Sequence, residues 1–234
     1  VMAGLDELCG ECRIADRIAA VSSVSGGSIG AYHIGASCLQ DARRHSRQSM
    51  LDEVGWGWLV ADIWRTIFPR FTERLVDRGW ALERTVRRIS GVKAAKMSEW
   101  GEEAGAGNKP AFLFNTTEVE HGRRVILSTV GLGERVTWRE LYQRSTGKLL
   151  DLEAVTAARL SAAFPFVSPT ARSTASSVYS GDYHLGDGGY YDNFGLYSLM
   201  DLLEQTLKAG GNTRVALLVI ESFPVQKIGS RDIL

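Results

Sequence analysis

Apolar positions recur along the chain with two different periods, and these predict strands and helices in turn. Short apolar runs rich in small and branched residues predict strands at 17–24, 111–117, 123–130 and 213–223. Helical spacing predicts helices at 3–13, 29–40, 51–90, 151–164 and 195–211. Glycines and a proline predict a loop at 101–110, and residues 165–186 are predicted as mixed loop and short strand. Helices that alternate with apolar strands predict an α/β fold whose sheet is packed on both faces.

The composition supports one folded domain and gives no argument for nucleic acid. Of the 234 residues, 44% are hydrophobic and 23% are charged, which suits a single sizeable core. Lysine and arginine together number 27, as do aspartate and glutamate, so the formal net charge is zero and no nucleic-acid partner is predicted. We therefore expect a single domain over residues 1–234.

Cysteine content and hydropathy favour a reducing compartment. An odd, sparse set of three cysteines argues against a disulfide framework: Cys9, Cys12 and Cys38. Cys9 and Cys12 form one CxxC pair without a second, so we interpret them as structural thiols and predict no metal site. No apolar run reaches the roughly 20 residues of a membrane span, and the first residues lack the features of a secretory signal. We expect a cytoplasmic protein.

The stretch SVSGGS at residues 23–28 carries the first chemical signal. A predicted buried strand runs directly into a glycine pair and then a helix, which is the arrangement of a nucleophile elbow. Ser25 stands at the bend, and the amides of Gly26 and Gly27 begin the helix, where they can stabilise an oxyanion. Ser23 replaces the first glycine of the usual G-x-S-x-G motif. A glycine-rich turn without chemistry is the alternative.

A serine hydroxyl becomes an effective nucleophile only when a base accepts its proton, and the usual base is histidine. Four histidines occur: His33, His45, His121 and His184. We interpret the first three as structural, because only His184 lies near another candidate group. Since no histidine follows it, a serine–aspartate–histidine triad would depend on His184.

The segment HLGDGGYYDNFG at 184–195 carries the second signal. Asp187 is followed by Gly188 and Gly189, and glycines beside a carboxylate allow another backbone to approach closely. Such a loop can bring Asp187 against a serine hydroxyl, although an aspartate is ordinarily a weak base. Asp192 has no glycine pair after it. A solvated Asp-Gly turn is the alternative interpretation.

Together these blocks resemble the patatin-like and cytosolic phospholipase A2 family. The family's serine lies on a strand-to-helix elbow, and its base is an aspartate in a D-G-G/A motif, here SVSGGS and DGGYYDN. LFNTTEVEHGRRV at 113–125 resembles the family's central strand pair. ARLSAAFPFVSP at 158–169 resembles the helix end that packs behind the dyad. The blocks follow the family order and extend over most of the chain.

The resemblance implies a three-layer patatin-like sheet flanked by helices and a Ser25–Asp187 dyad. It implies a lipid acyl hydrolase, either a phospholipase, a lysophospholipase or an esterase, that forms an acyl-enzyme without metal or cofactor. In the family, a G-G-G-x-[RK] loop before the first helix supplies oxyanion amides. No such cluster precedes VMAGLDEL at 1–8, so we expect this domain to lack its natural N-terminal glycine-rich segment.

A basic, aromatic stretch at 54–90 is a candidate for lipid contact. Between residues 65 and 88 the chain has seven arginines and three acidic residues, and tryptophans flank them. Such a stretch can lie on an anionic membrane surface, or form a lid or an acyl-chain groove. An amphipathic helix that packs on the core is the simpler interpretation. A catalytically idle scaffold that binds lipid or a protein partner is the alternative for the chain as a whole.

Overall fold

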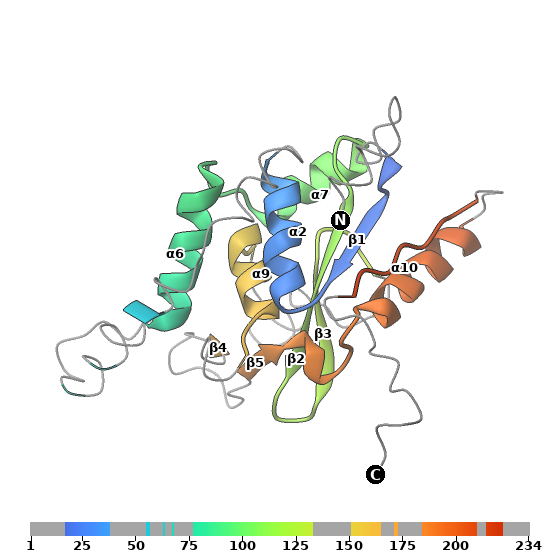
Figure 1. Ribbon diagram of the computed structural model, residues 1–234. Helices are drawn as coiled ribbons and strands as arrows, with labels where there is room; N and C mark the ends of the chain where they lie inside the picture. Colours follow the sequence, from blue (N-terminus) through green and yellow to red (C-terminus); the bar gives the residue numbers. More distant parts are fainter. Residues whose placement is uncertain are drawn as a thin grey trace, which may run out of the picture.

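The computed structural model describes residues 17–37, 55–56, 63, 67, 77–132, 151–164, 171–172, 184–209 and 214–221. In these parts of the chain, one sheet of five strands has helices on both faces (Figure 1). The predicted α/β class is therefore confirmed. The predicted helix at 3–13, the three cysteines, His45 and most of the basic stretch before residue 77 lie outside the described residues.

Strand β2 (Ala111–Glu118) is the centre of the sheet, because it pairs with three other strands. Antiparallel β3 (Arg123–Ser128) lies along one edge of β2 and follows it through a short turn, which confirms the predicted hairpin. The other edge is shared by β1 (Ala20–Ser23), parallel to the first half of β2, and by β5 (His184–Asp187), antiparallel to the second half. Strand β4 (Ala171–Arg172) extends the sheet beyond β5.

The two strands that share one edge of β2 meet end to end. Ser23 at the end of β1 is opposite Phe114, and Asp187 at the end of β5 is opposite Thr116. Because β1 is parallel to β2 and β5 is antiparallel to it, both strands end toward Asn115, the residue between those two positions. The segments that follow β1 and β5 therefore leave the sheet at the same place.

Alternate side chains of β2 enter two separate cores, as the two-residue period of a strand requires. Phe112 and Phe114 are fully buried in the larger core. Four helices supply its other face: α2 (Gly26–Ala36), α6 (Arg78–Ser90), α7 (Met97–Gly105) and α9 (Ala154–Ser161). Ala111 and Leu113 face the smaller core, against which Leu202 of α10 (Leu196–Lys208) packs. Figure 1 shows α2 and α9 side by side, with α10 on the opposite side of the strands.

An ion-pair cluster joins α6 to α9. The carboxylate of Glu83 accepts hydrogen bonds from Arg159 Nε at 2.9 Å, from Thr156 Oγ1 at 3.0 Å and from Arg87 Nη2 at 3.1 Å. Three donors satisfy a carboxylate that is largely removed from solvent, so this pairing offsets the cost of its desolvation. Helix α9 is thereby fixed between α6 and the sheet.

The predicted loop at 101–110 is wrong in its first half, because residues 101–105 are the second half of helix α7. Trp100, which is 3% exposed, anchors that helix in the core. The Asp151 carboxylate accepts a hydrogen bond from the Ser98 backbone N–H at 3.1 Å near its first turn. A Cβ on Gly101 would lie 2.5 Å from the Thr129 carbonyl oxygen. This glycine therefore permits a close helix–strand approach instead of ending the helix.

The strand predicted at 213–223 is also wrong over 214–221, the part of it that the structure describes. Residues 214–221 belong to no helix or strand. Their five large aliphatic side chains are 46–54% exposed: Val215, Leu217, Leu218, Val219 and Ile220. A strand is stable only when it is paired and one of its faces is covered, and in the described part of the chain this segment has neither.

None of the described helices is both long enough and apolar enough to cross a membrane.

Candidate active site

Ser25 lies in a strained backbone conformation directly after β1. With φ 54° and ψ −133°, it is the one non-glycine residue with positive φ in the described ranges. Residues with a Cβ adopt such angles only where the surroundings impose them, commonly at functional sites. Two hydrogen bonds fix this bend: Ser25 N–H donates to Ser161 O at 3.2 Å, and Ser28 N–H donates to Ser25 O at 2.9 Å. The predicted strand–turn–helix geometry around Ser25 is confirmed.

Gly26 and Gly27 are the first two residues of α2, and both are exposed. The amides of the first turn of a helix have no acceptor within the helix, so they are open to an anion. An added Cβ at either glycine would meet nothing within 4 Å. Crowding from the fold therefore does not require glycine at either position, and the space beside them is open.

Asp187 ends β5 as a buried carboxylate that is 2% exposed. Its Oδ1 accepts a hydrogen bond from Gly189 N–H at 2.8 Å. Its Oδ2 is buried and has no hydrogen-bond partner among the described residues. A buried polar atom without a partner costs about 1–3 kcal/mol and is uncommon in folded proteins. Its presence on this aspartate indicates an acceptor that is kept available.

The glycines after Asp187 allow the close backbone approach that the sequence predicts. A Cβ on Gly188 would lie 2.2 Å from the Asn115 carbonyl oxygen, so only glycine fits there. A Cβ on Gly189 would lie 3.0 Å from Asp187 Oδ1 and 3.9 Å from the Val24 side chain. The loop therefore lies against the residue that precedes Ser25.

The end of helix α9 holds both candidate catalytic residues by the backbone. Ser161 O accepts from Ser25 N–H at 3.2 Å, and Ala163 O accepts from Asp187 N–H at 3.1 Å. Two carbonyls two residues apart thus position the elbow and the aspartate. The structure brings Ser25 and Asp187 to the same edge of β2, but no hydrogen bond joins them, since Asp187 Oδ2 accepts none from the described residues. Such catalytic contacts often form only when substrate is bound.

A buried network around Asn115 was not identified from the sequence. Asn115 Nδ2 donates to Ser22 Oγ and to Ser23 O, each at 2.9 Å, and its Oδ1 accepts from Ser198 Oγ. Its backbone O accepts from Ser161 Oγ at 2.5 Å. The signal available in the sequence was the placement of Asn115 and Ser161 inside the two blocks that resemble the family.

Asp192 is the second acidic residue of this loop, and its carboxylate is fully used. It accepts from the backbone N–H groups of Phe194 at 3.1 Å, Gly195 at 3.0 Å and Tyr197 at 2.8 Å. These bonds cap the start of α10, as a side-chain carboxylate does at a helix N-terminus. The contrast with Asp187 identifies Asp192 as structural.

His184 lies at the opposite end of β5 from Asp187 and is paired elsewhere. Its ring Nδ1 contacts the Glu120 carboxylate, which also accepts from the His184 backbone N–H at 2.9 Å and 3.0 Å. Burial acts to raise the pKa of Glu120, but the hydrogen bonds and charge of His184 outweigh it and hold that pKa below its ordinary value. His33 is buried within α2, and His121 pairs with Glu118 at 2.7 Å. In the part of the chain that the structure describes, none of these three rings forms a hydrogen bond with Ser25.

Exposed aromatic side chains lie beside Asp187. Phe164 and Tyr190 stack with ring centroids 6.1 Å apart and planes 7° apart, and both are at least half exposed. Tyr191 and Tyr197 form an edge-to-face pair at 6.5 Å. In the basic stretch, Trp80 is 37% exposed and lies under the Arg84 guanidinium at 5.2 Å. The exposed rings close to Asp187 in the structure or sequence thus come from Phe164, shortly after the end of α9, from the loop after β5 and from the start of α10.

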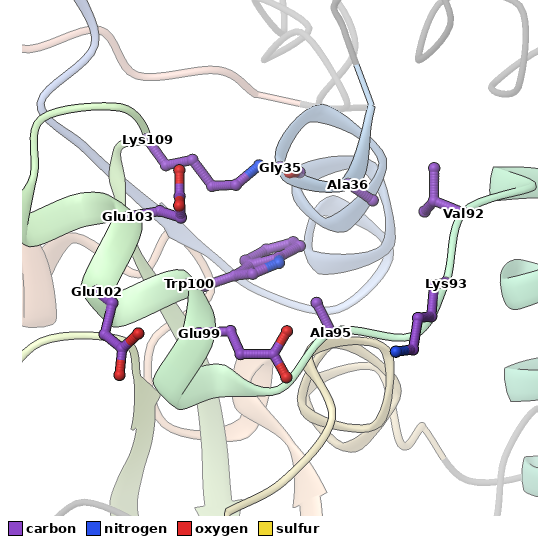
Figure 2. Close-up of a pocket in the computed structure, with 10 residues that line it drawn as sticks. All are labelled: Gly35, Ala36, Val92, Lys93, Ala95, Glu99, Trp100, Glu102, Glu103 and Lys109. Atoms are coloured by element: carbon purple, nitrogen blue, oxygen red, sulfur yellow. Dashed lines mark hydrogen bonds between the residues drawn. The ribbon is translucent and has the colours of Figure 1, made fainter.

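A shallow pocket of about 360 Å³ lies away from this site, between the end of α2 and α7 (Figure 2). Trp100 forms its floor, and three glutamates of α7 line it: Glu99, Glu102 and Glu103. Lys109 Nζ donates to Gly35 O at 2.7 Å, which stabilises the carbonyl end of α2. Lys109 thus acts as a helix-capping group, and the three glutamates are exposed surface residues.

Among the described residues, no cluster of three or more histidine, cysteine, aspartate or glutamate side chains is arranged to hold a metal ion. Comparisons of the chain with protein-family models, with curated proteins and with solved structures give no significant match. The patatin-like resemblance therefore remains a prediction that the residues alone carry.

Proposed function

We propose that this chain is a serine acyl hydrolase in which Ser25 is the nucleophile and Asp187 is its base. The observation that carries the proposal is the end-to-end meeting of β1 and β5 along β2, which places the segment after Ser23 and the carboxylate of Asp187 on either side of Asn115. Strain at Ser25 and an available oxygen on Asp187 are the two properties that such a pair needs.

The proposed reaction proceeds through an acyl-enzyme. Ser25 Oγ attacks the ester carbonyl carbon while Asp187 Oδ2 accepts the hydroxyl proton. The oxyanion of the tetrahedral intermediate lies at the amides of Gly26 and Gly27. Collapse expels the alcohol, which takes the proton from Asp187. Water then attacks the acyl-enzyme with Asp187 again as base, and the carboxylic acid is released as Ser25 is regenerated.

The surroundings of the site favour an apolar acyl group. The exposed rings of Phe164, Tyr190 and Tyr197 border the loop that carries Asp187, and aromatic faces bind alkyl chains through apolar contact. We therefore propose a lipid or other long-chain acyl ester as the substrate, with peripheral contact to a lipid surface and with patatin-like layering of the fold.

The test is labelling with a fluorophosphonate probe, which reacts with activated serines. We expect wild type and the control Ser37→Ala, at the other end of α2, to be labelled, with the adduct on the peptide that contains Ser25. Ser25→Ala should show none, and Asp187→Asn should react about 10²–10⁴-fold more slowly. Circular dichroism would establish that each variant is folded.

The other outcomes separate the competing functions. Loss of labelling in His184→Ala, with retention in Asp187→Asn, would replace the dyad by a histidine-dependent mechanism. A folded wild type that no probe labels, yet that binds lipid vesicles equally with and without Ser25, would favour the catalytically idle scaffold.

A further inference from the structure

Asn115 occupies the position on β2 between the ends of β1, the strand before Ser25, and β5, the strand that ends at Asp187. It is 1% exposed, and its side-chain amide uses both ends. Nδ2 holds β1 through Ser22 Oγ and Ser23 O, while Oδ1 holds α10 through Ser198 Oγ. An amide has both donors and an acceptor, which neither a carboxylate nor an aliphatic side chain combines.

The backbone of the same residue contacts the other two parts of the site. Asn115 O accepts from Ser161 Oγ at 2.5 Å, and Ser161 O in turn holds Ser25 N–H at 3.2 Å. The same carbonyl lies against Gly188, where a Cβ would be 2.2 Å from it. One residue thus touches the elbow, the end of α9, the glycine that follows Asp187 and the start of α10.

A second contact locks this arrangement from the β1 side. Ser22 Oγ, which accepts from Asn115, donates in turn to Gly195 O at 2.6 Å. Gly195 is the residue before α10, so the elbow strand and the end of the aspartate loop are joined directly and through Asn115. The chain Asn115–Ser22–Gly195 is hydrogen-bonded throughout, with Asn115 and Gly195 buried and Ser22 half-buried. Satisfied networks of this kind fix a single geometry.

We propose that Asn115 is a positioning residue that sets the separation of Ser25 and Asp187. It acts through Ser23 and Ser198 and touches no reacting atom. This inference rests on the proposed function. A displacement of about 1 Å between reacting groups can cost roughly 10²-fold in rate, so a change at Asn115 should reduce turnover without weakening substrate binding to the same degree.

Asn115→Asp tests the proposal most directly, because it keeps the shape and the acceptor for Ser198 while it replaces the donor to Ser22 Oγ and Ser23 O. With a 4-nitrophenyl acyl ester as substrate, we expect kcat to fall about 10²-fold while KM changes less than about threefold. Ser198→Ala removes the opposite contact, together with a 3.5 Å hydrogen bond from Arg124 Nη1, and should lower kcat in the same direction by a smaller factor. An unchanged kcat in both folded variants would overturn the proposal.

Ser90→Ala is the matched control for Ser198→Ala. Ser90 is also a buried serine, but on α6, where its hydroxyl donates to Arg87 O at 2.8 Å. Its removal should lower stability and leave kcat and KM unchanged. If Ser90→Ala reduced kcat as much as Ser198→Ala does, the effect would be a general loss of packing and Asn115 would have no positioning role.

A readout independent of activity separates this proposal from the proposed function. In amide NMR spectra, Asn115→Asp should shift the signals of Ser25 and Gly189 and leave that of Val86, in α6, in place. If these signals shift and the wild-type protein hydrolyses no ester, the positioning role is retained and the hydrolase function is rejected. Unmoved Ser25 and Gly189 signals would reject the positioning role even in an active enzyme.

Discussion

At the residue scale, the backbone conformation of Ser25 and the environment of the Asp187 carboxylate are both energetically unfavourable in themselves. The positive φ of Ser25 is of a kind that costs about 1–3 kcal/mol. Asp187 keeps one carboxylate oxygen buried with no donor from the described part of the chain. In contrast, every described carboxylate contact of Asp192 is made to a backbone N–H of the α10 start. The two aspartates lie five residues apart, and only their hydrogen bonds distinguish their roles.

The strain at Ser25 predicts different stabilities for two small substitutions. Ser25→Gly removes the Cβ that makes φ 54° unfavourable, so it should be more stable than Ser25→Ala by about 1 kcal/mol after the added chain entropy of glycine is allowed for. Urea unfolding monitored by circular dichroism measures the difference, and both variants should be inactive. Equal stabilities would mean that the bend is relaxed in solution.

At the element scale, elements with their own hydrophobic period could be predicted from the sequence, and elements defined by their neighbours could not. The hairpin of β2 and β3 and helices α9 and α10 follow from local pattern. Residues 101–105 are helical only because Trp100 is buried and Gly101 meets Thr129, and a glycine-rich segment gives no local sign of either contact. Residues 214–221 have the pattern of a strand, but no described strand pairs with them.

The same limit applies to the candidate site. Ser25, Asp187 and the glycines beside them could be proposed from motifs, because strand-to-helix bends and close backbone approaches demand particular residue types. Asn115 could not be proposed, because the role of a polar residue within a strand cannot be assigned until its hydrogen-bond partners are known. Those partners, Ser23 and Ser198, lie 92 and 83 residues away in the sequence.

The turn between β2 and β3 predicts a pH dependence. The pKa of Glu120 is below its ordinary value of 4.5 because His184 binds its carboxylate. The contact therefore contributes stability at pH values above 4.5, and this contribution is lost as the pH falls through the lowered pKa. The stability difference between wild type and Glu120→Gln, from urea unfolding between about pH 3 and pH 7, should shrink toward the acid end. A constant difference would mean that the contact does not form.

At the scale of the whole molecule, helices cover both faces of the sheet, but the two cores differ in size. Counting the residues that the structure describes, the larger core contains sixteen buried residues between the sheet and α2, α6, α7 and α9. The smaller contains four, with Leu202 of α10 packed against them. The aliphatic segment 214–221 is about half exposed and belongs to neither core.

This distribution predicts that a leucine-to-alanine substitution lowers the free energy of unfolding by very different amounts in the core and in residues 214–221. Leu113 is fully buried in the smaller core, so Leu113→Ala should lower the free energy of unfolding by about 2–5 kcal/mol. Leu218 is 54% exposed, and Leu218→Ala should change the free energy of unfolding by less than about 0.5 kcal/mol. Urea unfolding would compare the two variants. A large loss in Leu218→Ala would show that residues 214–221 are buried in solution.

The hydrogen bond from Ser22 to Gly195 joins residues that are 173 positions apart. Contacts that close such long loops form late, because closing the loop costs conformational entropy of the intervening chain. During synthesis on the ribosome, the elbow could not be secured until the segment beyond residue 195 had emerged. A nascent or truncated chain would therefore carry Ser25, the proposed nucleophile, without the geometry proposed for catalysis. Recovery of the proposed activity after dilution from urea would report the last step of folding, not the first.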